Sequence, residues 1–140
     1  MRQEGALMKK ICLLLAVCIL FAACPALSEN NATEMSAVIE QARAALEAAD
    51  FDTAVPLLRT AAEAGNDQAQ LWLGNCYDAG LGVEQSAEEA VKYYRLAADQ
   101  GNISAVYNLA FCYLEGRGAE QDPEKAEELL KSCADKGCIY

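Results

Sequence analysis

The sequence predicts an all-α fold, an α/α solenoid in which three antiparallel helical hairpins stack into a right-handed superhelix. The first observation behind this prediction is an internal repeat: residues 66–101 align without a gap with residues 102–137 and share fourteen of 36 positions. The second is that apolar residues within each unit recur at the spacing of a helix. The third is that glycines stand where these helices must end. Because one hairpin cannot bury its apolar face alone, neighbouring hairpins are expected to share a core.

The first helix of each unit is predicted from the spacing of its apolar residues. Ala69, Leu73 and Cys76 lie at i, i+4 and i+7, which places them on one face of a helix. The same three residue types recur 36 positions later in the second unit. A Gly-x-Gly sequence then stops each helix, at Gly80–Gly82 and at Gly116–Gly118, because glycine adopts the left-handed conformation of a helix end without a clash at Cβ.

The second helix of each unit is predicted to begin behind a side chain that can cap it. Ser86 and Asp122 are both good N-cap residues. Glu89 stands three residues after Ser86, a spacing that predicts a capping box in the first unit. Gly101 and Gly137 are expected to end the two second helices.

A further hairpin is expected upstream of the two full units. It consists of helices over Thr33–Ala49 and Asp52–Ala64, joined by a tight turn at residues 50–52. Its second half, residues 54–65, matches residues 90–101 at the same offset of 36. The predicted organisation is therefore an N-terminal hairpin at 34–65, repeat units at 66–101 and 102–137, and a tail at 138–140.

The first 28 residues have the composition of a signal peptide. A basic start precedes thirteen apolar residues, Ile11–Ala23, fewer than the roughly 20 that span a bilayer. Small residues up to Ser28 fit a cleavage site, with residues 29–33 as a linker. Phe21–Cys24 is close to a bacterial lipobox, and lipidation of Cys24 with a membrane tether is the alternative. The chain is thus expected to be exported, to the periplasm or outside the cell.

Two segments of the first unit carry a family signature. Residues 69–83 follow the pattern A-x-x-x-L-G-x-x-Y-x-x-G-x-G-V, and residues 90–101 follow A-x-x-Y-Y-x-x-A-A-x-x-G. These motifs resemble the Sel-one-like repeat, a relative of the tetratricopeptide repeat, and the resemblance covers about residues 34–137. The second unit departs from the pattern, with Ala110 for Gly74, Ala119 for Val83 and Leu129-Leu130 for the tyrosine pair. The resemblance implies a non-catalytic bacterial scaffold that presents a concave surface to proteins or peptides.

Six residues on the first helices, opposite the motif face, are candidates for contact with a partner. They are Leu71, Asn75 and Asp78 in the first unit and Tyr107, Phe111 and Leu114 in the second. The second set forms an aromatic and apolar stripe that would anchor an extended peptide or a helix. The alternative is that the stripe packs between units, because solenoid helices bury more than one face.

The last helix raises a separate question about the C-terminal end. Its apolar residues are expected to be partly uncovered, since no further helix follows in the repeat pattern: Ala126, Leu129, Leu130 and Cys133. Two interpretations stay open, a longer repeat array and self-association through this end.

Four cysteines follow the predicted cleavage site. Cys76 and Cys112 occupy equivalent points on the motif face and are expected to act as small apolar core residues. Cys133 and Cys138 flank the end of the last helix, and the cysteine-rich exported branch of the family implies a disulfide there, although the spacing is short. Four scattered cysteines without histidine predict no metal site.

Composition argues against catalysis and against nucleic acid. The 140 residues contain no His, which removes the commonest general base, and 11 Lys+Arg against 21 Asp+Glu give a net charge of −10. No phosphate-binding loop, dinucleotide-binding motif, nucleophile elbow or S-x-x-K acylation motif is present in the sequence. We therefore expect a protein-binding scaffold without cofactor or metal. A module that binds cell wall or glycan is the alternative, and a periplasmic hydrolase of the penicillin-binding or β-lactamase-like kind comes third.

Overall fold

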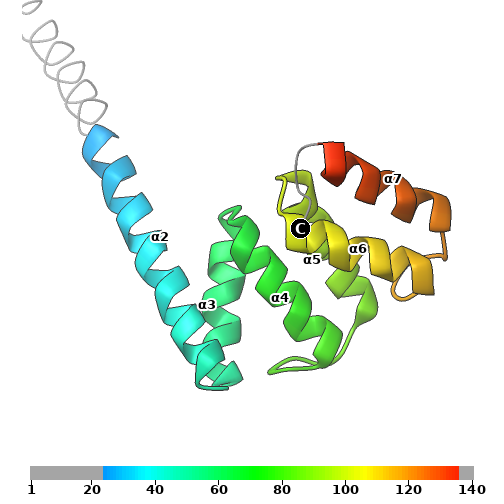
Figure 1. The fold of residues 1–140 in the computed structure, drawn as a ribbon. Helices are drawn as coiled ribbons and strands as arrows, with labels where there is room; N and C mark the ends of the chain where they lie inside the picture. Colours follow the sequence, from blue (N-terminus) through cyan, green and yellow to red (C-terminus); the bar gives the residue numbers. More distant parts are fainter. Residues whose placement is uncertain (1–23, 136–140) are drawn as a thin grey trace, which may run out of the picture. The chain divides into compact units, whose positions relative to one another are not determined.

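The computed structural model describes residues 24–135, and this part of the chain consists of six α-helices without a strand (Figure 1). The helices are α2 (Cys24–Glu47), α3 (Phe51–Glu63), α4 (Asp67–Ala79), α5 (Ala87–Asp99), α6 (Ile103–Glu115) and α7 (Pro123–Asp135). The chain divides into two compact units, residues 1–37 and 38–140. The predicted all-α fold is confirmed. The packing and the sites described below lie in the second unit, which begins at Val38.

The helices follow the 36-residue period of the sequence. The three second helices of the hairpins, α3, α5 and α7, are each 13 residues long and begin at residues 51, 87 and 123. The two first helices of the full repeats, α4 and α6, are also 13 residues long and begin at residues 67 and 103. The offset predicted for the half unit upstream therefore holds for a complete helix.

Helix α2 is longer than predicted. It begins at Cys24 and includes residues 29–33, for which the sequence predicts a linker. No glycine or proline stands between Pro25 and Pro56, and Pro25 lies in the first turn, where its missing N–H costs no hydrogen bond. Nothing in the sequence therefore stops the helix before Ala49, which adopts a left-handed conformation with φ 56°.

The loops repeat as closely as the helices do. Asn102 Oδ1 accepts a hydrogen bond from the N–H of Ala105 at 3.1 Å, as Asn66 does at the start of α4 at 2.8 Å. At the other end, Gly80 and Gly116 cap α4 and α6 in the left-handed conformation, with φ 69° and 68°. The predicted stops of these helices, at Gly80 and Gly116, are confirmed.

Ser86 caps α5, but the predicted capping box is only half formed. Its Oγ accepts a hydrogen bond from the N–H of Glu89 at 3.3 Å. Its own N–H donates to the carbonyl of Tyr77 at 2.9 Å, while the Glu89 carboxylate accepts from Lys92 at 3.1 Å. The prediction of a reciprocal box was wrong because the loop after α4 folds back and supplies a backbone acceptor. Asp122 repeats the arrangement, donating its N–H to the equivalent tyrosine carbonyl at 2.8 Å.

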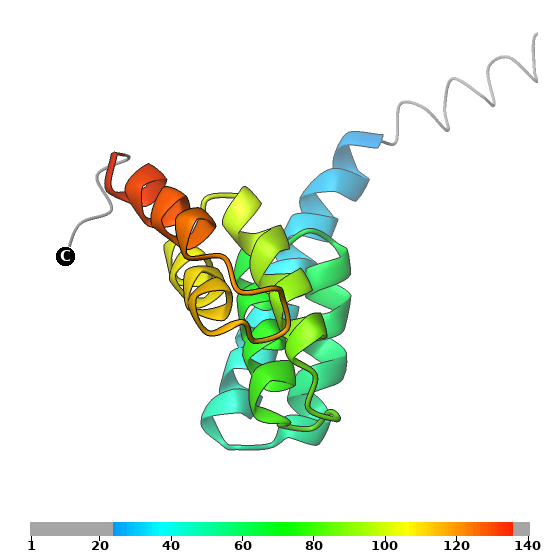
Figure 2. The ribbon, with the colours of Figure 1, turned by 90° about the vertical axis from the view of Figure 1, so that its right-hand side faces the viewer.

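Packing runs from each helix to its neighbour in sequence, from α3 to α7. Figures 1 and 2 both show α7 at the far end of this stack from α3. Leu58, Leu73, Cys76 and Cys112 are the largest fully buried side chains. A core cluster joins α5 to α6 through Val91, Tyr94, Leu109, Ala110 and Tyr113, and it also includes Leu71 of α4.

Candidate interaction site

A polar pocket of about 250 Å³ opens where α4, α5 and α6 meet. Its lining comes from the C-terminal half of α4, from α5, from α6 and from the loop after α6: Asn75, Asp78, Tyr94, Asn108, Phe111 and Arg117. Three of these residues, Asn75, Asp78 and Phe111, are among the six predicted for partner contact. The structure thus brings residues from both predicted sets to one site.

Gly74 allows Tyr94 to form the floor of this pocket. A Cβ atom at Gly74 would lie 2.7 Å from Cε1 and 2.8 Å from Cδ1 of the Tyr94 ring, closer than carbon atoms approach without moving. The ring therefore lies directly against the backbone of α4, and Tyr94 is 2 % exposed. Its hydroxyl donates to Asn75 Oδ1 at 2.8 Å.

Asn75 links three helices through its side-chain oxygen. Besides the bond from Tyr94 on α5, Oδ1 accepts from Nδ2 of Asn108 on α6 at 3.1 Å. Two donors on one oxygen fix the orientation of the Asn75 amide. Within the described residues the Nδ2 group of Asn75 has no protein acceptor, so it can donate to a bound group.

Asp78 and Arg117 supply charges of opposite sign at the pocket. Their closest atoms, Asp78 Oδ2 and Arg117 Nη2, lie 3.5 Å apart, and Arg117 also lies 3.8 Å from a Glu115 oxygen. The Arg117 side chain is exposed and that of Asp78 is half-buried, and a surface pair of this kind contributes about 0–1 kcal/mol to stability, so a ligand can displace it at little cost. Burial, with a further contribution from the Asp78 charge, raises the pKa of Tyr94, which keeps its hydroxyl a donor.

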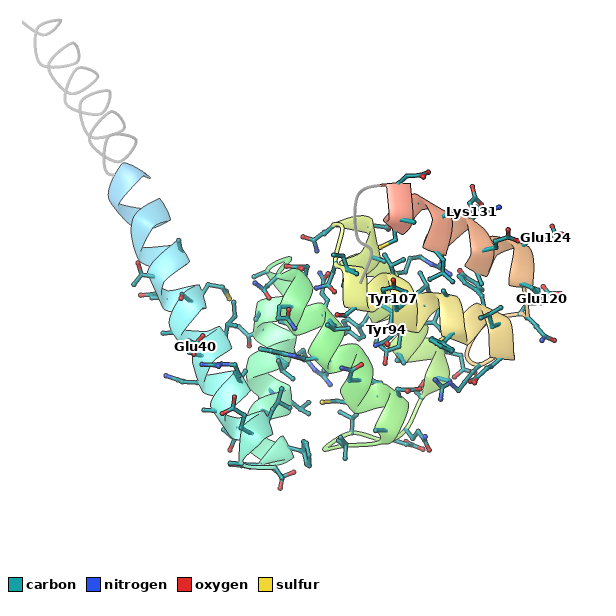
Figure 3. All side chains as sticks on the ribbon, in the orientation of Figure 1. Glu40, Tyr94, Tyr107, Glu120, Glu124 and Lys131 are labelled. Carbon is teal, nitrogen blue, oxygen red and sulfur yellow. The ribbon has the colours of Figure 1, made fainter. Side chains whose placement is uncertain are left out.

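The predicted stripe on α6 is exposed, but it does not form one surface. Tyr107, Phe111 and Leu114 are 37 %, 56 % and 38 % exposed, against the interpretation that they are packed between units. Phe111 borders the polar pocket, whereas Leu114 lines a separate groove between α6 and α7. Tyr107 lines neither the pocket nor the groove (Figure 3).

Leu71 was wrongly predicted to contact a partner. It is 6 % exposed and belongs to the core cluster with Tyr94 and Leu109. The prediction treated the motif face as the only buried face of α4, but α6 packs on α5 and buries this second side as well.

The comparison with family models decides which repeat this is. The model of the Sel1 repeat matches residues 67–102 and 103–138. The chain belongs to the Sel1 repeat family. Proteins with Sel1 repeats typically act as scaffolds for protein interactions.

Solved structures agree with this assignment. A protective antigen of uropathogenic Escherichia coli strains with an SLR fold is 38 % identical, with a TM-score of 0.59, over 61 % of this chain and 18 % of its own. A Sel1 repeat protein from Oxalobacter formigenes is 35 % identical, also with a TM-score of 0.59, over 61 % of this chain and 66 % of its own. The chain thus spans less than two thirds of the length of either protein.

Helicobacter pylori cysteine rich protein B shares the fold, with a TM-score of 0.59 at 17 % identity over 74 % of this chain and 89 % of its own. No curated protein matches the chain.

The sequence considered position by position does not indicate Asn108, Arg117 or the Gly74–Tyr94 contact as parts of the site. A signal for Asn108 was present, since it precedes Phe111 by three residues and so lies on the same side of its helix. A signal for Gly74 was present as well. The second Sel1 repeat carries Ala110 where the first has Gly74, and Leu130 where the first has Tyr94. The tyrosine and the glycine are thus replaced together.

The cysteines of the two Sel1 repeats are buried. Cys76 and Cys112 are free thiols with 2 % and 1 % exposure, which confirms them as core residues. Burial raises the pKa of both thiols, so neither is activated as a nucleophile. Cys133 is 5 % exposed, and its predicted partner Cys138 lies outside the described residues, so the Cys133–Cys138 disulfide stays a prediction.

Two further observations concern ligands and membranes. Between residues 24 and 135, no three His, Cys, Asp or Glu side chains are grouped so that they could hold a metal ion. None of the helices described there is both long and apolar enough to cross a bilayer. Residues 1–23 lie outside the described part of the chain, and cleavage after Ser28 and lipidation of Cys24 stay predictions.

Proposed function

We propose that this Sel1 repeat protein is an exported, non-catalytic scaffold that binds a segment of another protein at the pocket between α4, α5 and α6. The observation that carries the proposal is Phe111, a large apolar side chain left 56 % exposed at the edge of a polar pocket. Exposed aromatic anchors beside fixed hydrogen-bonding groups are typical of binding surfaces.

The chemistry of the pocket suits a polypeptide. The amides of Asn75 and Asn108 can pair with a peptide backbone, and the tie to Tyr94 holds them in place before binding. Phe111 offers apolar contact to one side chain of the ligand. The Asp78 carboxylate favours a ligand with a basic or amide group at the neighbouring position.

Export is part of the proposal and rests on residues 1–28. Their basic start and short apolar run are typical of a signal peptide, and removing them leaves a net charge of −12, from 20 acidic and 8 basic residues. The tethered form with a lipidated Cys24 is the variant of this proposal that keeps the protein at a membrane. The mass of the mature N-terminus, measured on protein from its source, distinguishes cleavage after Ser28 from lipidation.

Affinity capture with matched variants tests the binding proposal. The full chain, tagged at its C-terminus and produced in its source, serves as bait in the envelope and extracellular fractions. Phe111→Asp is expected to lose a protein that the wild type retains, because a carboxylate replaces the apolar anchor. Leu96→Asp is the control, since Leu96 on α5 is 43 % exposed and lies outside the pocket.

Circular dichroism of both variants establishes that they are folded. Equal retention by wild type and Phe111→Asp, with both folded, contradicts a binding site at this pocket. Retention of saccharide with no protein contradicts the protein-binding function and favours the glycan-associated alternative.

A further inference from the structure

A second surface lies at the end of the stack. It is a groove of about 530 Å³ between α6 and α7, here called the end groove. Its apolar lining consists of Leu114, Pro123, Ala126, Leu130 and Ala134. Ala126 forms the buried floor, Leu114 is 38 % exposed and Leu130 is partly buried. Two charged residues, Glu127 and Lys131, lie beside them.

The repeat register shows that the equivalent surface one unit earlier is covered. Ala126 and Leu130 correspond to Ala90 and Tyr94, which are 0 % and 2 % exposed and belong to the core that includes α6. The same holds at the start of α7, because Pro123 corresponds to Ala87. A Cβ at Gly118, in the loop after α6, would lie 2.1 Å from the Ala87 carbonyl oxygen, so that loop lies directly on α5.

No helix of the described chain covers the end groove as α6 covers α5. The groove therefore has the residue pattern of an internal packing surface without its neighbour. Covering such a surface removes apolar area from water at about 25 cal/mol per Å².

We propose that the end groove pairs with the end groove of a second copy of the chain around a two-fold axis. The groove of a second copy offers the same apolar residues, so both surfaces are buried together. A head-to-tail arrangement would instead oppose the groove with the other end of the stack, where the part of α2 from Val38 on lies beside α3 (Figure 1). The exposed residues of α2 from Val38 on are largely polar: Glu40, Gln41, Arg43 and Glu47.

Under this two-fold symmetry, the charged residues beside one groove are complementary to those beside the other. Glu127 and Lys131 are one turn apart on α7, with 2.6 Å between their charged atoms, and both are well exposed. When two α7 helices cross antiparallel about an axis near residue 129, Glu127 of each copy faces Lys131 of the other. A two-fold contact therefore forms two ion pairs across the interface. Figure 3 shows Lys131 and Glu124 on α7, far along the stack from Glu40 on α2.

Sedimentation equilibrium with charge variants tests this pairing. Untagged protein purified from its source is expected to show a monomer–dimer equilibrium. Glu127→Lys and Lys131→Glu are each expected to weaken the dimer about tenfold or more, because like charges then face each other. Combining both substitutions exchanges the two charges and is expected to restore the dissociation constant to within about threefold of the wild type. Both side chains are exposed, so all three variants should fold.

The controls separate this proposal from peptide binding. Phe111→Asp, which alters the polar pocket, is expected to leave the dissociation constant of the dimer unchanged, because Phe111 does not line the end groove.

Three outcomes would overturn the proposal. The first is a wild-type protein that stays monomeric at all concentrations up to about 100 µM. In that case the occupant of the groove would be residues 136–140 or another protein. The second is a dimer indifferent to both single substitutions, and the third is a failure of the double variant to recover.

Discussion

Gly74 and Tyr94 determine the candidate pocket at the scale of single residues. The missing side chain of one lets the ring of the other lie on the backbone of α4, and the tyrosine hydroxyl then orients Asn75. In the second repeat the corresponding residues are Ala110 and Leu130. A leucine has no para-hydroxyl to place, so a methyl group on the facing helix is tolerated there.

Gly74→Ala is predicted to destabilise the protein by about 1–3 kcal/mol, because the Tyr94 ring must move away from the new Cβ. In a Tyr94→Leu background the same substitution is predicted to cost much less, since the pair then matches Ala110 and Leu130. Urea denaturation of the four proteins in this cycle measures the coupling. Equal costs of Gly74→Ala in both backgrounds would show that the ring contact does not determine the choice of glycine.

At the scale of elements, the loop after each first helix joins one unit to the previous one. Gly82 lies against Phe51 at the start of α3, and Gly118 lies against Ala87 at the start of α5, again 36 residues apart. A Cβ at Gly82 would lie 2.9 Å from the Phe51 carbonyl oxygen. Both glycines have φ near 70°, so conformation and space both require the absence of a side chain.

Gly118→Ala is predicted to cost clearly more stability than Gly101→Ala. Both positions have positive φ, and that conformation alone costs an alanine about 1–2 kcal/mol. A Cβ at Gly101 meets open space, whereas one at Gly118 meets the backbone of α5, which cannot rotate away. We expect an additional cost of about 2 kcal/mol or more at Gly118, measured by urea denaturation. Equal losses at the two sites would mean that the loop does not rest on α5 in solution.

Most elements could be predicted because each carries a signal that repeats. Asn102 and Gly116 cap α6 as Asn66 and Gly80 cap α4, so one unit supports the interpretation of the other. The start of α2 could not be predicted in this way, since the upstream hairpin has no matching first helix. The burial of Leu71 was also out of reach, because it depends on where the next unit lies. The periodicity of a single helix does not contain that information.

The candidate site was predicted in part for the same reason. Asn75, Asp78 and Phe111 lie on first helices, whose exposed side follows from the motif. Arg117 comes from a loop, and Tyr94 belongs to the motif itself, so neither stood out as a site residue. Arg117 and Tyr94 lie beside the three predicted residues only because α4, α5 and α6 meet at this point.

At the scale of the whole molecule, the stack from α3 to α7 is held together by contacts between consecutive helices. Stability in such a protein is close to a sum over units and the interfaces between them. Of the helices from α3 to α7, the last one buries the fewest residues. Only Ala126 and Cys133 of α7 are buried, against six residues of α4 and four of α5.

Hydrogen exchange is predicted to follow this gradient. Amides of α7 should exchange faster than those of α4 and α5, because opening the end of the stack exposes less apolar surface than opening its middle. Mass spectrometry of peptides after deuterium labelling measures the difference, at protein concentrations below those at which a dimer forms. Equal protection along the stack would indicate that it opens as one cooperative unit.

The loops that lie on the preceding helix also bear on how this protein can evolve. The loop at Gly118 meets α5 as the loop at Gly82 meets α3, and Arg95 donates to Tyr113 as Arg59 donates to Tyr77. A gene that loses or duplicates residues 67–102 brings together ends whose contacts already exist elsewhere in the chain. The length of the protein can therefore change by whole units through recombination, without a new interface having to arise.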